Sequence, residues 1–149
     1  MRASDQFHVG IVVEDVDATL AQLTELFGYE WCPEIGGPVP VHLPSGVETL
    51  DLRLVYSRNE PRIEVIRRVP GSLWEPAMGS GIHHIGYWSD DLARDAVALE
   101  ASGMAREAAG ADESGALLWT YHRGSSGPRV EMISTQVRSS MEEYWSSSR

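Results

Sequence analysis

Two histidines and two glutamates recur at matching positions in this 149-residue chain. The run Pro-Arg-Ile-Glu-Val-Ile at residues 61–66 returns as Pro-Arg-Val-Glu-Met-Ile at residues 128–133, and His-Val-Gly at 8–10 returns as His-Ile-Gly at 84–86. Imidazole nitrogens and carboxylate oxygens together suit Zn, Ni, Co, Mn or Fe(II). The repeat therefore predicts a metal centre whose ligands are His8, Glu64, His84 and Glu131.

The alternation of residue types places all four side chains on one face of a sheet. Successive residues of a strand point to opposite faces, so His8 points away from its apolar neighbours, which should pack under a helix. Glu64 and Glu131 also lie between apolar residues, and burying a carboxylate is costly unless it is paired or binds metal. The alternative is that each glutamate pairs with an arginine two residues earlier on the same strand face, Arg62 or Arg129.

The repeats divide the chain into two βαβββ modules, residues 5–70 and 80–137. The Gly- and Pro-rich residues 68–81 connect them, and a polar tail at 138–149 should dock through Tyr144 and Trp145. Further strands are expected at 50–56, 63–66, 116–121 and 130–133. Residues 29–49, rich in Gly and Pro, predict an irregular loop with one short strand.

Each module also has a helix with recognisable end signals. Asp15 and Asp91 can accept hydrogen bonds from the free N–H groups of a first helical turn, and Gly28 and Gly103 can end the helices. The first helix should pack on the sheet through one apolar face, made of Val16, Leu20, Leu23 and Phe27.

This double βαβββ layout, with His on the first strand and Glu on the last strand of each module, resembles the vicinal oxygen chelate superfamily. Glyoxalase I, methylmalonyl-CoA epimerases, extradiol dioxygenases and bleomycin-resistance proteins are members. The resemblance covers about residues 6–134 and implies an α+β fold, in which two modules form a curved mixed-sheet cup around one divalent metal ion. It maps the ligands onto the repeated quartet, with Glu64 or Glu131 as the catalytic base. The adjacent His83 should point to the helix side, as a packing residue or a partner of the ligands.

Within the superfamily, the sequence favours an isomerase or epimerase that shifts a proton next to a carbonyl or thioester. Ile-His-His-Ile at 82–85, followed by Asp-Asp-Leu at 90–92, is similar to methylmalonyl-CoA epimerases, which usually have Gln where Glu64 stands. The glutathione-binding residues of glyoxalase I are missing, because Val12 and Arg68 occupy those positions. Two alternatives are a lyase acting on a thiol adduct other than glutathione, and a non-catalytic small-molecule (antibiotic) binding or resistance protein.

Substrate contacts are less clearly marked than the ligands. Arg68 and Arg123 are candidate contacts to an anionic group of a small-molecule substrate. Tryptophans are more often core residues than ligand contacts, but four of them could supply an aromatic pocket: Trp31, Trp74, Trp88 and Trp119. Many relatives dimerise, so a homodimer is also expected.

Composition excludes several classes of function. The net charge of −10 disfavours nucleic-acid binding, and all 12 cationic side chains are Arg, so a lysine Schiff base is impossible. Cys32 is the only cysteine, which excludes an intrachain disulfide. No apolar run is long enough to span a membrane, so a cytoplasmic location is expected.

Overall fold

The computed structural model describes residues 1–147, in which two βαβββ modules follow one another. The first module contains η1 (Ala3–Asp5), β1 (Gln6–Val13), α1 (Val16–Phe27), β2 (Ile35–Leu43), β3 (Gly46–Tyr56) and β4 (Ile63–Arg67). The second contains β5 (Ile82–Ser89), α2 (Leu92–Ala101), β6 (Ala105–Ala111), β7 (Leu117–Arg123) and β8 (Val130–Ser134), followed by η2 (Thr135–Val137) and α3 (Arg138–Ser146).

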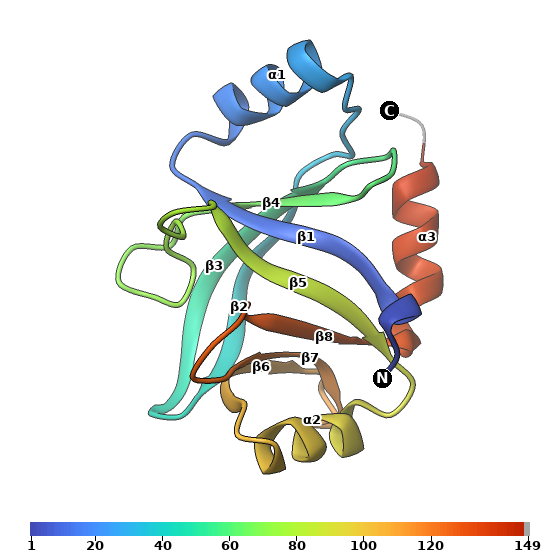
Figure 1. Ribbon diagram of the computed structural model, residues 1–149. Coiled ribbons are helices and arrows are strands. Elements are labelled where there is room, and N and C mark those ends of the chain that lie inside the picture. Colours follow the sequence, from blue (N-terminus) through green and yellow to red (C-terminus); the bar gives the residue numbers. More distant parts are fainter. Residues whose placement is uncertain (148–149) are drawn as a thin grey trace.

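The strands form one closed barrel in the order β1-β4-β3-β2-β6-β7-β8-β5. Within the modules β1 runs parallel to β4 and β5 parallel to β8, while β1 and β5 join the modules as an antiparallel pair. On the other side β2 and β6 lie side by side, and their strand pairing among the described residues is the single pair His42 and Ala109. Helices α1 and α2 lie on opposite sides of the barrel and α3 runs alongside it (Figure 1). The predicted α+β fold with a curved mixed sheet is confirmed, and the sheet closes completely.

Strand β2 corrects the expectation of an irregular segment at 29–49. It is nine residues long and pairs along its whole length with β3, which begins at Gly46 rather than at residue 50. Pro38 and Pro40 lack the N–H that an inner strand needs, but prolines are tolerated where a strand lacks a close neighbour on one side. Strand β2 has such a side, because its ladder with β6 consists of the single pair His42 and Ala109.

Helix α1 packs on the sheet through its first part, and its last residue does not contribute as the sequence indicates. Asp15 accepts a hydrogen bond from the Ala18 N–H at 2.9 Å, and Gly28 ends the helix with φ of 73°. The expectation that Phe27 packs on the sheet is wrong, because this side chain is 69% exposed. Tyr29 and Trp31, which follow the helix, pack into the core beneath it instead.

The C-terminal tail forms helix α3, which is held to the barrel by aromatic side chains. The Tyr144 hydroxyl donates a hydrogen bond to the Pro33 carbonyl at 2.6 Å. The Trp145 ring lies 3.9 Å from the Arg62 guanidinium and 5.9 Å from the ring of Phe7 on β1. The tail therefore docks as expected, although its residues 148–149 lie outside the described part of the chain.

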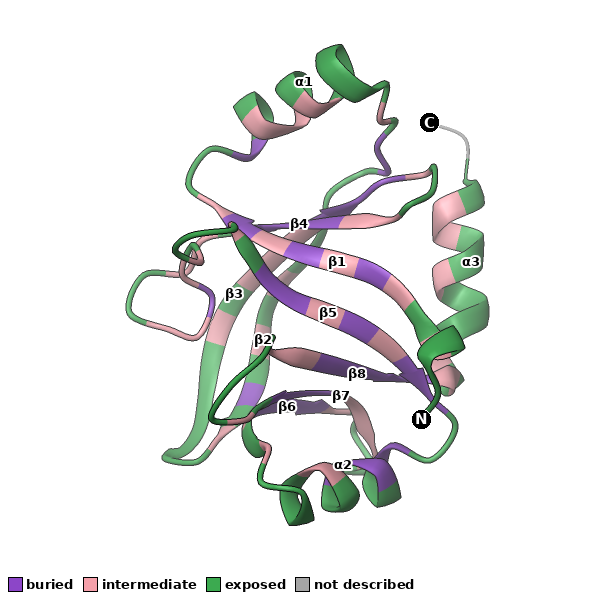
Figure 2. Cartoon of the chain, in the orientation of Figure 1, coloured by how far each residue is buried: buried purple, intermediate pink, exposed green. Residues whose placement is uncertain are grey.

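Burial follows the two faces of the central strands. Along β1, residues 8, 10 and 12 are buried and alternate with partly buried ones, as the bands of β1 and β5 show in Figure 2. Val12 packs with Ile66, Trp74 and Tyr121 in one core, while partly buried Ile11 belongs to a second core under α1. Among the described residues, no helix is long and apolar enough to cross a membrane.

Candidate metal centre

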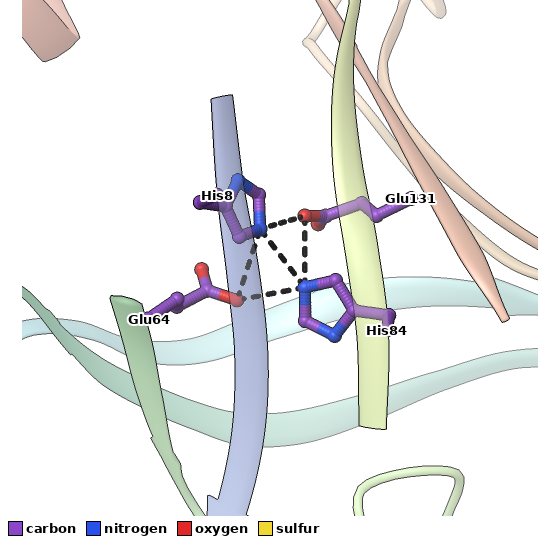
Figure 3. Close-up of side chains that lie close together, drawn as sticks. All are labelled: His8, Glu64, His84 and Glu131. Atoms are coloured by element: carbon purple, nitrogen blue, oxygen red, sulfur yellow. Dashed lines mark hydrogen bonds and ion pairs between the residues drawn. The ribbon is translucent and has the colours of Figure 1, made fainter. Parts of the chain in front are cut away.

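The four repeated residues come from the four strands at the centre of the sheet. His8 lies on β1, Glu64 on β4, His84 on β5 and Glu131 on β8. Their side chains converge inside the barrel (Figure 3), and each residue is at most 5% exposed. The structure thus brings together the whole set that the repeats single out.

Two glycines at the β1–β5 junction make room for this arrangement. Gly10 pairs with both Glu64 and His84, and Gly86 pairs with both His8 and Glu131. A Cβ atom on Gly10 would lie 1.8 Å from Cε1 of His84, and a Cβ atom on Gly86 would lie 1.9 Å from Cε1 of His8. Each module's glycine therefore provides the space for the other module's imidazole. The repeated His-x-Gly motif is the sequence signal of this requirement.

The donor atoms are spaced as ligands of one ion are spaced. The two Nε2 atoms are 2.9 Å apart, and Oε2 of Glu131 lies 3.1 Å from Nε2 of His8 and 3.3 Å from Nε2 of His84. Oε2 of Glu64 lies 3.1 Å from Nε2 of His84 and 3.7 Å from Nε2 of His8. Ligand atoms about 2.1 Å from a metal, at angles of about 90–110°, lie about 3.0–3.4 Å apart. The chain therefore offers four donors, all within 4.8 Å of one another.

The buried carboxylates have no other partner that explains their burial. Oε2 of Glu64 and Oε2 of Glu131 are buried without a hydrogen bond among the described residues. The arginine pairing considered above is not formed, because Arg62 bonds to the Ser57 carbonyl and to Glu60, and Arg129 bonds to Glu107. Orphaned buried oxygens beside two imidazoles fit a divalent cation.

The charges of the quartet are strongly coupled. Burial alone would lower the pKa of His84, but the Glu131 and Glu64 carboxylates raise it to about 9. Burial would raise the pKa of the Glu131 carboxyl, but the His84 and His8 imidazoles lower it well below its usual range. Without a metal ion, the quartet therefore holds a proton on His84 beside an ionised Glu131, and a bound divalent cation would take the place of that proton.

The comparison with protein families is decisive for the membership of the chain. The sequence model of the family described as Glyoxalase/Bleomycin resistance protein/Dioxygenase superfamily matches residues 7–121. The matched region includes His8, Glu64 and His84, whereas Glu131 lies beyond it and is supported by the internal repeat. The chain belongs to this superfamily.

Solved structures with a similar fold include methylmalonyl-CoA epimerases. One from Mycobacterium tuberculosis has a TM-score of 0.61 and 17% identity, covering 90% of this chain and 92% of that one. A variant of the Streptomyces coelicolor enzyme, in complex with 2-nitronate-propionyl-CoA, has a TM-score of 0.59 and 17% identity. The match covers 87% of this chain and 96% of that one. A hypothetical protein from Bacillus halodurans C-125 has a TM-score of 0.58 and 18% identity, and the match covers 87% of this chain and 92% of that one. Identities this low support the fold alone, and no curated protein sequence matches the chain.

His83 contacts the imidazole of His84 on the side that faces away from the centre of the quartet. Its Nδ1 is 3.0 Å from Nδ1 of His84, and its Nε2 is 2.9 Å from the Leu73 carbonyl. Burial lowers the pKa of His83 to about 4, which keeps the ring neutral. A neutral His83 can donate from Nε2 to Leu73 and accept at Nδ1 from His84, an arrangement that leaves Nε2 of His84 facing the centre.

Two tyrosines that the sequence reasoning did not select also belong to the site. Tyr56 pairs with Glu64 across β3 and β4, and Tyr121 pairs with Glu131 across β7 and β8. Burial and the carboxylates raise the pKa of both phenols well above the usual value, so both stay protonated. Both occur in a repeated Tyr-x-Arg motif, at residues 56–58 and 121–123, which was the available signal.

A cavity of about 360 Å³ opens onto the quartet. Glu64 and Glu131 form part of its wall together with Tyr56 and Tyr121. Most of the remaining wall is apolar, and includes Leu52, Leu54, Ile66, Trp74, Trp119 and Met141. Of the four tryptophans considered from the sequence, Trp74 and Trp119 therefore line the site.

The other two tryptophans and the two selected arginines lie elsewhere. Trp31 belongs to the core under α1, and Trp88 stacks on Phe7 at 4.0 Å between ring centres. Arg68 forms ion pairs with Glu14, at 2.6 Å, and with Glu75. Arg123 lines a different pocket, beside the residues that connect the modules. Neither arginine is part of the cavity at the quartet.

Proposed function

We propose that the protein is a metal-dependent isomerase or epimerase that moves a proton on the carbon next to a carbonyl or thioester. The observation that supports this function is a pair of buried carboxylates at the wall of an apolar cavity, whose nearest charged partners are two imidazoles and whose Oε2 atoms have no hydrogen bond among the described residues. Buried structural carboxylates normally have their hydrogen-bonding capacity satisfied. In the described part of the chain, these two form ion pairs only with the imidazoles of the quartet, through Oε2, and they also line a cavity that a substrate can occupy.

In this proposal the quartet holds one divalent ion: Zn, Ni, Co, Mn or Fe. When bound, the ion supplies Lewis-acid polarisation of two adjacent substrate oxygens. His8 and His84 would serve only as ligands, because their side chains are fully buried. Glu64 and Glu131 would be ligands that also face the cavity.

The proton transfer is assigned to a glutamate. A carboxylate at the cavity wall can take a proton from the substrate carbon and return it, and repacking around a ligand can adjust its basicity. We favour Glu131, whose side chain is 7% exposed against 2% for Glu64. The protonated phenols of Tyr56 and Tyr121 can donate hydrogen bonds where negative charge develops on the substrate.

Hydrogen–deuterium exchange at the substrate carbon tests this function. Protein stripped with a chelator and reloaded with Co(II) is mixed in D2O with methylmalonyl-CoA or with 2-hydroxy-1-phenylpropan-1-one, and proton NMR follows the C2–H signal. We expect metal-dependent loss of that signal for at least one compound, and its suppression by Glu131→Gln. A general base contributes about 100- to 10,000-fold to a rate. Metal bound with no exchange of either compound would contradict the proposal.

The apolar cavity also supports a second candidate, a protein that binds a small molecule without converting it. Apolar pockets with a few convergent polar groups are typical ligand sites. The Glu131→Gln variant separates the two functions, because a binding protein keeps its ligand after this change, whereas an enzyme loses turnover. The expected homodimer and cytoplasmic location stay predictions.

A further inference from the structure

The charged groups that line the cavity are all acidic. Glu64 and Glu131 are the only charged side chains among the described residues that line it. Its other polar groups include the phenol hydroxyls of Tyr56 and Tyr121, which carry no charge in their ordinary protonated form. Among residues 1–147, a substrate entering this cavity therefore meets two carboxylates and no cationic side chain.

Three arginines in the segments that lead into β4 and β8 are engaged in contacts outside the cavity. Arg62, on the approach to β4, bonds to the Ser57 carbonyl at 2.6 Å and packs on Trp145. Arg129, before β8, bonds to Glu107 at 2.5 Å. Arg58 bonds to the carbonyls of Trp31 and Trp145. If one of these arginines rotated into the cavity, it would lose the hydrogen bonds or the ion pair that it makes with neighbouring segments.

The site is neutral once it holds its ion. Two ionised glutamates balance one divalent cation, and the two imidazoles bind as neutral ligands. An anionic substrate would therefore leave an uncompensated negative charge in a buried place, which is strongly unfavourable. A neutral substrate adds no charge to the site.

From this lining we infer that the substrate is a neutral molecule with two adjacent oxygens on a hydrophobic body, such as an aromatic diketone or hydroxyketone. The inference rests on the proposed metal centre and specifies its substrate class. The cavity volume of about 360 Å³ corresponds to about a dozen waters at 30 Å³ each, enough for one ring and a short side chain. Trp74 and Trp119, with ring centres 6.1 Å apart and nearly perpendicular planes, provide aromatic surface for such a ring.

Two probes of equal size test the inference. 1-Phenyl-1,2-propanedione and phenylglyoxylate share a phenyl ring and two adjacent oxygens, and differ in carrying a methyl group or a negatively charged oxygen. Their binding to the Co(II)-loaded protein is measured by isothermal titration calorimetry, with metal content determined on the same sample. We expect the dione to bind at least about tenfold more tightly, or about 1.4 kcal/mol. Equal or tighter binding of phenylglyoxylate would overturn the inference.

A rim variant provides an independent check. Ile35 on β2 lines the cavity and is 37% exposed, so Ile35→Arg can place a cation at the mouth without burying it. We expect this variant to shift the preference toward phenylglyoxylate. Val47→Arg, at an exposed position of β3 outside the cavity, is the matched control and should leave the preference unchanged. An unchanged preference in Ile35→Arg would contradict the role of charge.

The failure of this inference differs from a failure of the proposed function. If the reloaded protein contains no metal, the proposed centre is wrong and the substrate class falls with it. If metal is bound and the anion binds more tightly, only the substrate class is wrong. Metal-stripped protein should bind the dione more weakly than loaded protein, because the two adjacent oxygens lose their common partner.

Discussion

The two modules supply equivalent candidate ligands but support them differently. In the second module, His84 is backed by His83, which in turn bonds to the Leu73 carbonyl. In the first module, Phe7 precedes His8, and Nδ1 of His8 is buried without a hydrogen-bond partner among the described residues. His8 is held by ring contacts instead, 4.4 Å from Phe7 and 5.4 Å from Tyr56 between centres.

This difference separates the features that the two halves of the proposed metal centre share from the one feature that a single half has. The imidazole, the carboxylate, the glycine opposite and the tyrosine beside the carboxylate occur twice. The outer partner of the imidazole occurs once. We expect changes to the shared features to affect both modules alike and changes to the outer partner to affect the second module alone.

The largest effect should come from the shared glycines. Gly10→Ala and Gly86→Ala each drive a methyl group into the imidazole of the other module. Neither glycine has a positive φ, so the backbone tolerates alanine and the collision with the ring is the main cost. We expect either variant to weaken metal binding by about 100-fold or more, beyond the 10- to 100-fold cost of losing an outer ligand partner. Competition with a chromophoric chelator measures the affinity.

Gly124→Ala is the control for this prediction. A Cβ atom there lies 3.6 Å from its nearest heavy atoms, an ordinary contact distance. Metal affinity like that of the unchanged protein in Gly10→Ala or Gly86→Ala would show that the imidazoles do not need the space the glycines provide. A large loss in only one of them would contradict the equivalence of the modules.

The second effect concerns His83, the outer partner found only in the second module. His83→Phe gives this module the Phe-His sequence of the first, and removes the acceptor for Nδ1 of His84. We expect metal affinity to fall by about 10- to 100-fold. His83→Gln keeps a polar group behind His84 and should recover part of the affinity. His42→Phe, at an exposed position, is the control, and an equal affinity in His83→Phe would argue that packing alone orients His84.

Much of the fold could be predicted because its signals are local and occur twice. Asp91, like Asp15, caps its helix by accepting a first-turn N–H, from Arg94 at 3.1 Å. Alternation along β1 placed His8 and Ile11 on opposite faces. The length of β2 could not be predicted, because its prolines are acceptable only where the neighbouring strand diverges, which is a property of the closed barrel. The prediction that Phe27 packs on the sheet failed because Tyr29 and Trp31, which follow the helix, occupy that part of the core.

The candidate site was predictable as far as the repeat extends. Duplication identified the four ligand candidates, and strand alternation gave them a common face. The positions of Arg68 and Arg123 could not be predicted, because the acidic partners of Arg68 are brought to it by folding. Tyr56 and Tyr121 carried a repeat signal, but phenols are ordinary core residues, and only the cross-strand register shows that each faces a glutamate.

The tyrosines provide a third and smaller test of the comparison. Tyr56→Phe and Tyr121→Phe remove one phenol without changing the size of the ring. Because a hydrogen bond contributes about 0.5–1.5 kcal/mol, each change should slow exchange of the substrate C–H by a few-fold. If Glu131 moves the proton, Tyr121→Phe should have the larger effect. A larger effect of Tyr56→Phe would assign the proton transfer to Glu64, and no effect of either would exclude both phenols from the reaction.

The smallest effect lies outside the centre, at a helix position where the modules also differ. In α2, buried Asp95 accepts hydrogen bonds from Ser89 at 2.8 Å and Arg94 at 3.0 Å. Although burial opposes it, these donors lower the pKa of Asp95 below its usual value. A carboxyl with a lowered pKa stabilises the folded state above its unfolded pKa, about 3.9, and this contribution is lost as the pH falls further.

We therefore expect Asp95→Asn to lower stability by about 1 kcal/mol at pH 7, a decrease of about 2–4 °C in Tm. The difference from the unchanged protein should narrow below about pH 4, where Asp95 takes up a proton in the unfolded chain. Thr19→Ala changes the corresponding position of α1, whose hydroxyl bonds only to the local Asp15 carbonyl, and should change Tm less. Thermal melts followed by circular dichroism at pH 7, 5, 4 and 3 measure both variants. A Tm difference for Asp95→Asn that stays constant across this range would show that its charge contributes nothing, and that α1 and α2 are anchored by packing alone.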